Sequence, residues 1–287
     1  MAGIQAKQLD PSVPLGPWSW AGGQDGPLDI SGAYSQTGDV YASTLRLRAG
    51  AVWTSNNWRI FCLTPPQIDA GAILACDGVD GGASSVGGAA GIAVVFGTLG
   101  QGFDGGAGGT SSHDGAPGGG PVAGGPFSYI ATSGGAGGNA GGGGHGGVGG
   151  APALPPERGL CLSDVIRYTT GAQTFDNPRQ AGLGGGGGGS DDGGNPGGGG
   201  GSGAGEIQIW APGLILGGTL RARGGRGGAG DRGPAGGGGG TGGIIRLMLP
   251  PQSLVLLAGG AFNVSGGLGG AGVSPGQPGG LGLVLHP

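Results

Sequence analysis

The chain of 287 residues contains 85 glycines, only 10% charged and 5% aromatic residues, and has a formal net charge of −4. Glycine loses more backbone entropy on folding than any other residue, so the chain must either stay disordered or recover that cost through dense backbone hydrogen bonding. Disordered chains usually combine low hydrophobicity with high net charge, and this chain has neither. We therefore expect the glycine-rich segments to be packed.

Composition also disfavours several partners. The 12 Lys and Arg residues are scattered and only Arg221, Arg223 and Arg226 cluster, so we do not expect nucleic acid as a partner. No apolar run approaches the roughly 20 residues of a membrane span. Residues 1–20 lack the basic and apolar regions of a secretory signal, which predicts synthesis in the cytoplasm.

In chain order, the sequence begins with a proline-rich segment that carries Trp18 and Trp20, and continues into residues 44–53, which alternate apolar and polar residues as a strand does. No shift in charge separates independent globular domains, so we expect one continuous architecture. We divide it into a proline-rich N-terminal segment (residues 1–27), a strand-rich base (28–78), a long glycine-rich arm with interrupting loops (79–205) and repeated strand units with two short glycine-rich arms (206–287).

Three segments, beginning at Trp58, Glu206 and Ile244, share one plan. In each, an alternating strand reaches a proline, and a second short strand then ends in glycine. An isoleucine precedes the proline by five residues in all three units, as the pairs Ile60 and Pro65, Ile207 and Pro212, and Ile245 and Pro250 show. Proline cannot donate a ladder hydrogen bond, so a fixed offset predicts a corner at which successive units stack.

The glycine tracts that leave these units have Gly-Gly-Xaa spacing, which fits a left-handed threefold helix rising about 3.1 Å per residue, with every N–H bonded to a neighbouring helix. Collagen is disfavoured because it needs glycine at every third position, and residues 134–150 break that register. The expected fold class is all-β plus polyglycine II: stacked short strands, β-solenoid-like, with glycine-rich polyglycine II arms and little or no helix.

The strand-rich region STLRLRAGAVWTSNNWRIFCLTPPQIDAGAILACDG, the Gly-Gly-Xaa arms, and the restarting strands GEIQIWAP and GGIIRLMLPP together resemble glycine-rich bacteriophage tail fibre or tail-tip proteins. The arms look like the polyglycine II sandwich of phage tail-fibre adhesins. Over residues 28–287 this resemblance implies a virion protein of the tail, often a homotrimer, whose exposed loops bind a host surface glycan or protein. Residues 1–27 would then dock onto other tail proteins.

Few residues have a pattern typical of catalysis or of cofactor binding. The pair Asp191 and Asp192, with Asp104 and Asp114, could form a glycosidase site, although solvated loop tips are the simpler interpretation. The many glycine-loop matches lack the strand, helix and lysine context of nucleotide binding. The cysteines Cys62, Cys76 and Cys161 have neither disulfide nor metal spacing, so we expect buried small hydrophobes. We predict no enzyme, no cofactor and no metal.

Side chains that interrupt the glycine tracts are the best candidates for receptor contact, because reversals of an arm expose them on a rigid scaffold. They are His113, Asp114, Phe127, Tyr129, Asp191 and Asp192. The sequence therefore predicts a structural tail protein of a virion that contributes to host attachment. The alternatives are an architectural virion part, such as a head decoration or tail plug, and a non-viral glycine-rich cell-surface protein.

Overall fold

The computed structural model of the chain describes residues 23–83, 88–92, 99, 102–110, 113–119, 133–140, 144–150, 182–191, 195–230 and 235–286. All regular elements within these ranges are β-strands. They are β1 (Gly26–Ile30), β2 (Ala33–Ser35), β3 (Val40–Leu47), β4 (Val52–Thr54), β5 (Arg59–Cys62), β6 (Gln67–Ile68), β7 (Ile73–Ala75), β8 (Glu206–Trp210), β9 (Leu214–Leu216), β10 (Thr219–Arg221), β11 (Ile244–Met248), β12 (Leu254–Leu256), β13 (Ala261–Asn263) and β14 (Leu283–Leu285).

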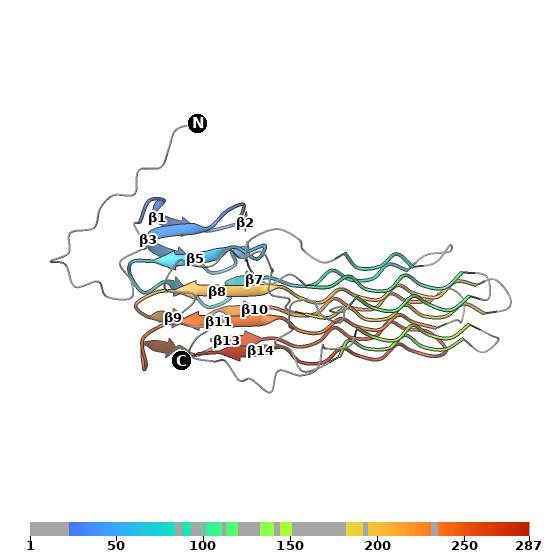
Figure 1. Cartoon of the computed structure of the whole chain (residues 1–287). Coiled ribbons are helices and arrows are strands. Elements are labelled where there is room, and N and C mark those ends of the chain that lie inside the picture. Colours follow the sequence, from blue (N-terminus) through green and yellow to red (C-terminus); the bar gives the residue numbers. More distant parts are fainter. Residues whose placement is uncertain are drawn as a thin grey trace, which may run out of the picture.

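The strands form two sheets, and the strand pairs are parallel (Figure 1). The 9-stranded sheet has the order β12-β9-β6-β3-β5-β8-β11-β14, with β1 also paired to β3. The 5-stranded sheet has the order β13-β10-β7-β4-β2. Strand β3 bonds with β5 through Val40 and Ile60, and with β6 through Leu47 and Ile68, so it joins two ladders into one curled sheet.

The expected fold class, a β-solenoid-like strand stack with polyglycine II arms, is wrong, because the strands make these two parallel sheets, one of them curled. The prediction assumed a proline corner in every rung. All three repeated units do have one, since Pro65 lies between β5 and β6, Pro212 between β8 and β9, and Pro250 between β11 and β12. The eight residues of β3 contain no proline, so this strand continues across the corner and links the ladders.

A single large apolar core holds the strands together. Alternation places Ile207 and Ile209 in this core, fully or almost fully buried, while Glu206, Gln208 and Trp210 occupy the opposite face of β8. The same core receives side chains from the neighbouring strands, among them Leu47, Trp53, Ile60, Ile68, Leu74, Leu214, Leu216, Leu220, Ile245 and Leu247.

The glycine-rich segments run away from the strands, side by side, and their described residues form no strand (Figure 1). We call the described residues 78–83, 88–92, 102–110, 113–119, 133–140, 144–150, 182–191, 195–205, 224–230, 235–243, 266–271 and 275–282 the glycine layer. Its backbone hydrogen bonds repeat every three residues. Gly184, Gly185 and Gly186 donate to Gly119, Gly201 and Gly135. Gly187, Gly188 and Gly189 then donate to Ala116, Gly198 and Gly138, on the same three neighbouring segments.

Three segments lie at the centre of the glycine layer: residues 182–190, 197–205 and 235–243. Each of them donates in turn to three neighbouring segments, and all of their residues are buried. Their composition follows from this position. A Cβ on Gly200 would lie 2.0 Å from the carbonyl oxygen of Gly185, far inside contact distance. The nearly pure glycine of these three segments is therefore a packing requirement.

Each of the surrounding segments has one side open to solvent. Every third residue of these segments points outward and is not glycine, as Asp104, Ala107 and Thr110 illustrate in one segment and His145 and Val148 in another. Gly-Gly-Xaa spacing thus marks a segment at the surface of the glycine layer, and an unbroken glycine run marks one in its interior.

Asn57 connects the strands to the glycine layer. Its Oδ1 accepts hydrogen bonds from the N–H of Glu206 at 2.8 Å and from the Cys76 thiol at 3.1 Å, where β8 begins and β7 has just ended. Asn57 has a positive φ of 62°, a conformation that asparagine tolerates better than most residues. This side chain is fully buried, so it fixes the start of the layer relative to the core.

Candidate functional site

The end of the glycine layer farthest from the strands gathers several chain reversals (Figure 1). The turn that ends at His113 contacts the segment that ends at Ser190. The N–H of His113 donates to Ser190 Oγ at 2.9 Å, and Ser190 Oγ donates back to the carbonyl oxygen of His113 at 3.0 Å. Ser190 is fully buried, so a hydroxyl replaces glycine where two turns must be joined. We call this end of the layer the tip.

Two acidic side chains hold the reversals at the tip. Asp114 Oδ1 accepts from the N–H of His145 at 2.7 Å, which joins neighbouring segments of the layer. Asp191 accepts from the backbone N–H of Asn195 at 2.9 Å and from its side-chain Nδ2 at 2.8 Å, so it closes its own turn. Asn139 plays a similar part, since its Oδ1 accepts from the N–H of Gly146 at 2.8 Å. These contacts define the shape of the tip through short polar side chains.

Among the predicted receptor-contact residues, the structure brings His113, Asp114 and Asp191 to the tip. The side chains of His113 and Asp114 are exposed there, and Asp191 is half-buried. The imidazole of His113 lies 2.7 Å, through Nδ1, from the carbonyl oxygen of Thr110. Phe127, Tyr129 and Asp192 lie outside the described residues. Sequence reasoning missed His145 and Asn139, although both are exposed and both interrupt glycine tracts at the same end of the layer.

Asp104 and Asp114 do not form a glycosidase pair. Gly119 donates to the carbonyl oxygen of Asp104, so Asp104 and Asp114 lie about five residues apart along adjacent segments, or roughly 15 Å at the threefold rise. Glycosidase carboxyls are separated by at most about 9.5 Å. The described residues also contain no group of three or more His, Cys, Asp or Glu side chains that could hold a metal ion.

A second cluster of polar and aromatic side chains lies on the strands. Tyr41, Phe61, Trp210 and Met248 occupy matching positions on β3, β5, β8 and β11. The Tyr41 and Phe61 rings stack with centroids 4.8 Å apart, and Phe61 and Trp210 are 6.1 Å apart. Phe61 and Trp210 are buried, which favours a role in packing. The alternating sequences contained these aromatics, but only the strand register aligns them.

Beside this ladder, a buried ion pair joins Arg246 on β11 to Glu206 on β8, with 3.1 Å between Nε and Oε1. Nearer the surface, Arg59 binds Asp39 at 2.8 Å and lies over the Phe61 ring. Burial, and after it the charge of Asp39, raises the pKa of the Tyr41 hydroxyl. These groups are partnered across the strands, so we assign them to the cohesion of the sheet.

No protein-family model, curated protein or solved structure matches the chain. Within the ranges that the structure describes, no helix is long and apolar enough to cross a membrane. The candidate site therefore rests on geometry alone, and the tip is the part of the described chain where exposed, non-glycine side chains from several reversals come together.

Proposed function

We propose that this chain is a structural tail protein of a bacteriophage, in a fibre or at the tail tip, that contributes to host attachment and has no enzymatic activity. The strand sheets anchor the glycine layer, and the layer carries the tip away from them. The observation that supports this proposal is the convergence of polar reversals at one distant end, with Asp114, Asp191 and Ser190 holding the turns in place.

Rigidity is what the glycine layer contributes to binding. Each central segment is bonded on three sides, so the turns that it supports lose little conformational entropy when a ligand binds. Loops on a rigid scaffold are the usual carriers of recognition residues. The exposed side chains at the tip, including His113, His145 and Asn139, can donate and accept hydrogen bonds and suit a polar ligand such as a host surface glycan or protein.

The other parts of the proposal come from the resemblance. The protein would be made in the host cytoplasm and located in the virion tail, as a homotrimer, with residues 1–27 docked onto other tail proteins. The alternative functions are a purely architectural virion part, such as a head decoration or tail plug, and a non-viral glycine-rich surface protein. Labelled antibody on particles distinguishes these by showing where the chain lies.

Adsorption to host cells tests the attachment function. The variant H113A/H145A removes two exposed side chains at the tip but keeps the backbone N–H groups that Ser190 and Asp114 bind. Its matched control is I92A/V148A, which truncates side chains that are 67% and 68% exposed on the sides of the layer. We expect the wild-type protein and the control to bind cells and compete with phage adsorption, and the tip variant to lose about tenfold or more in affinity.

Two results would contradict the proposal. Wild-type protein that neither binds cells nor competes with adsorption excludes attachment and favours the architectural alternative. Equal binding by the tip variant and the control would place the contact elsewhere than at the tip.

A further inference from the structure

The last rung of the strands leaves both sheets open at the same end of the molecule. Strands β12 and β14 terminate the 9-stranded sheet, and β13 terminates the 5-stranded sheet. In the described chain, β12 pairs with β9, β13 with β10 and β14 with β11, each on one side only. Such strand edges present backbone donors and acceptors to any strand that approaches them.

This end is also apolar. Val255, Leu256 and Leu257, at β12, are 48%, 54% and 48% exposed. The adjoining segments of the glycine layer, residues 266–271 and 275–282, continue the apolar character, because Leu268 and Leu281 are 62% and 65% exposed. We call β12, β13, β14 and these two segments the terminal face. Single exposed leucines are common, but a group of them along open strand edges marks an interaction surface.

Charge is absent from the sequence of the terminal face. From residue 247 to residue 287 the chain contains no Asp, Glu, Lys or Arg. Natural sheets usually protect an exposed edge with charged side chains, so their absence over the whole last rung is informative. Protein interfaces, in contrast, are depleted of charge at their centre.

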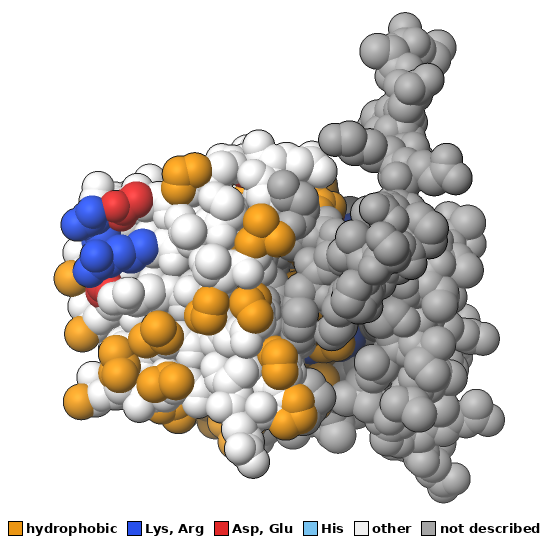
Figure 2. Space-filling model, turned by 90° about the vertical axis from the view of Figure 1, so that its left-hand side faces the viewer, with side chains coloured by type: hydrophobic (Ala, Val, Ile, Leu, Met, Phe, Trp, Pro, Cys, Tyr) orange, Lys and Arg blue, Asp and Glu red, His pale blue; other side chains and the backbone are white. Residues whose placement is uncertain are grey.

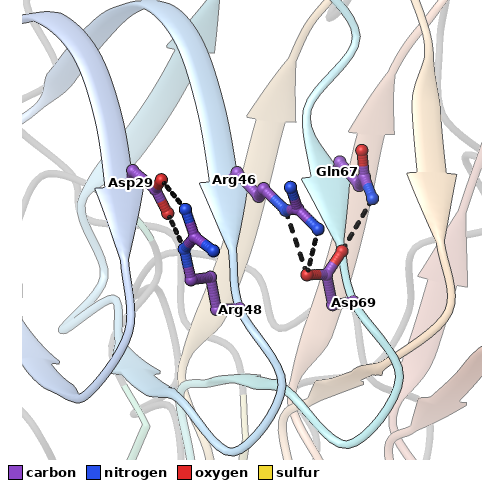
Figure 3. Close-up of polar contacts among 5 residues, drawn as sticks. All are labelled: Asp29, Arg46, Arg48, Gln67 and Asp69. Atoms are coloured by element: carbon purple, nitrogen blue, oxygen red, sulfur yellow. Dashed lines mark hydrogen bonds and ion pairs between the residues drawn. The ribbon is translucent and has the colours of Figure 1, made fainter.

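At the opposite end, the edge formed by β1 has this protection. Strand β1 carries Asp29, whose Oδ1 accepts from Arg48 Nε at 2.6 Å, and this hydrogen bond lowers the pKa of the Asp29 carboxyl (Figure 3). Arg46 and Gln67 both bind Asp69 close by (Figure 3). Figure 2, which views the molecule from the left-hand side of Figure 1, shows the charged side chains of that face grouped in one part of it and hydrophobic side chains spread over much of the rest. The two ends of the sheets are therefore chemically different.

The chain itself shows which chemistry fits such an edge. Leu214, Ile215 and Leu216 of β9 are covered by Leu254, Val255 and Leu256 of β12 in parallel register. Another apolar strand could add to β12 at the same spacing, and a second copy of this chain supplies such a strand. The net charge of −4 opposes close approach of two copies in general, but the uncharged terminal face adds no local repulsion.

We propose that the terminal face binds the terminal face of a second copy of this chain. The strand edges and the leucines of β12 and residues 266–282 form the contact. On the glycine side the contact is made by side chains, because the exposed outward positions Pro275 and Pro278 lack the N–H needed to extend the backbone hydrogen bonds. Because the contact joins two identical faces, it closes a dimer. It is therefore distinct from the homotrimer that the proposed function takes from the resemblance, and it does not depend on the receptor contact.

Light scattering and sedimentation of the full chain at micromolar concentration test the inference. The variant L256K/L281K places two charges on the terminal face, at positions 54% and 65% exposed. The control I92K/V148K places two charges on the glycine layer away from that face, at positions 67% and 68% exposed. We expect the wild-type chain and the control to self-associate, and the terminal-face variant to associate at least about tenfold more weakly. Circular dichroism checks that all three proteins keep the same strand content.

A wild-type chain that is monomeric overturns the inference, as does a terminal-face variant that associates as strongly as the control. A monomer that still binds host cells contradicts the self-docking and leaves the attachment function intact. An oligomer that fails to bind cells supports the self-docking and contradicts the attachment function.

Discussion

Burial sets the chemistry of the two cysteines that the structure describes. Cys62 is buried among core side chains, and Cys76 is buried where it donates its thiol proton to Asn57 Oδ1. Desolvation raises the pKa of the Cys62 thiol to about 12 and that of the Cys76 thiol to about 11. The expectation of buried, small hydrophobic cysteines is confirmed for both residues, and Cys161 lies outside the described residues. Spacing alone was enough for this expectation, because it excluded disulfide and metal frameworks.

These pKa values predict that Cys62 and Cys76 resist alkylation in the native protein. At pH 8 both thiols stay protonated, and the thiolate is the reactive form. Peptide mapping after treatment with iodoacetamide should find both residues unmodified in native protein and modified in denaturant. Stability should be unaffected by these thiols below pH 9, the ordinary pKa, and should fall as the pH rises from 9 toward 11, since the unfolded state then releases protons first. Rapid native labelling of either residue would contradict the assigned burial.

Strand register shows how far an element can be predicted from its pattern. The shared five-residue offset to proline aligns Ile207 with Ile245, and these two residues are partners in the structure. The first unit departs from the pattern, because Ile60 pairs with Ile209, two residues further on. A shift of two keeps the same side chains in the core, since strand side chains alternate with a period of two. The hydrophobic pattern therefore predicted which side chains of each strand enter the core, but it did not predict how the first unit pairs with the second.

In the glycine segments, the neighbours of a segment determine whether a side chain fits at a given position. In the interior of the layer a Cβ on Gly200 would meet the Gly185 carbonyl oxygen at 2.0 Å, whereas a Cβ on Gly38 meets nothing within 4 Å. Both residues are glycine in the sequence, and only an unbroken glycine run, compared with Gly-Gly-Xaa spacing, hints at the difference.

Alanine at these two positions tests the rule. We expect G200A to lower the free energy of unfolding by about 3 kcal/mol or more, because backbone must move apart to accept the methyl group. We expect G38A to be neutral or to stabilise by up to about 1 kcal/mol, because alanine restricts the unfolded chain. Thermal and urea unfolding of both variants measure this contrast. Equal, small effects would show that the glycine layer is loosely packed.

At the scale of the whole molecule, the arrangement of the glycine layer could not be deduced from the sequence. Neighbouring segments are far apart in the chain, as the hydrogen bonds from Gly186 to Gly135 and from Gly238 to Gly186 show. Glycine has no side chain to specify a partner, so many pairings look equivalent in the sequence. His113, Asp114 and Asp191 were candidates because they interrupt glycine tracts, and the structure places all three at the tip. Receptor contact by these residues stays a prediction.

The passage of the chain from one sheet to the other is a second feature of the whole molecule that depends on one local detail. Residues 44–53 were expected to be a strand, but the structure has β3 from Val40 to Leu47 and a separate β4 in the other sheet. The difference arises at Gly50, which has a positive φ of 78° and allows the chain to turn between the sheets. The alternation of apolar and polar residues continues through this turn, so the sequence pattern did not predict the turn.

The central claim is that the glycine layer is a hydrogen-bonded scaffold that holds the tip in place, and hydrogen–deuterium exchange of the backbone amides tests it most directly. The amides of residues 184–189, 198–203 and 236–240 donate to neighbouring segments in the structure. We predict that peptides from these residues are protected to an extent similar to β8 and β11, which belong to the core of the sheets. Exchange of these amides at the rate of an unstructured peptide, while β8 and β11 stay protected, would contradict the claim.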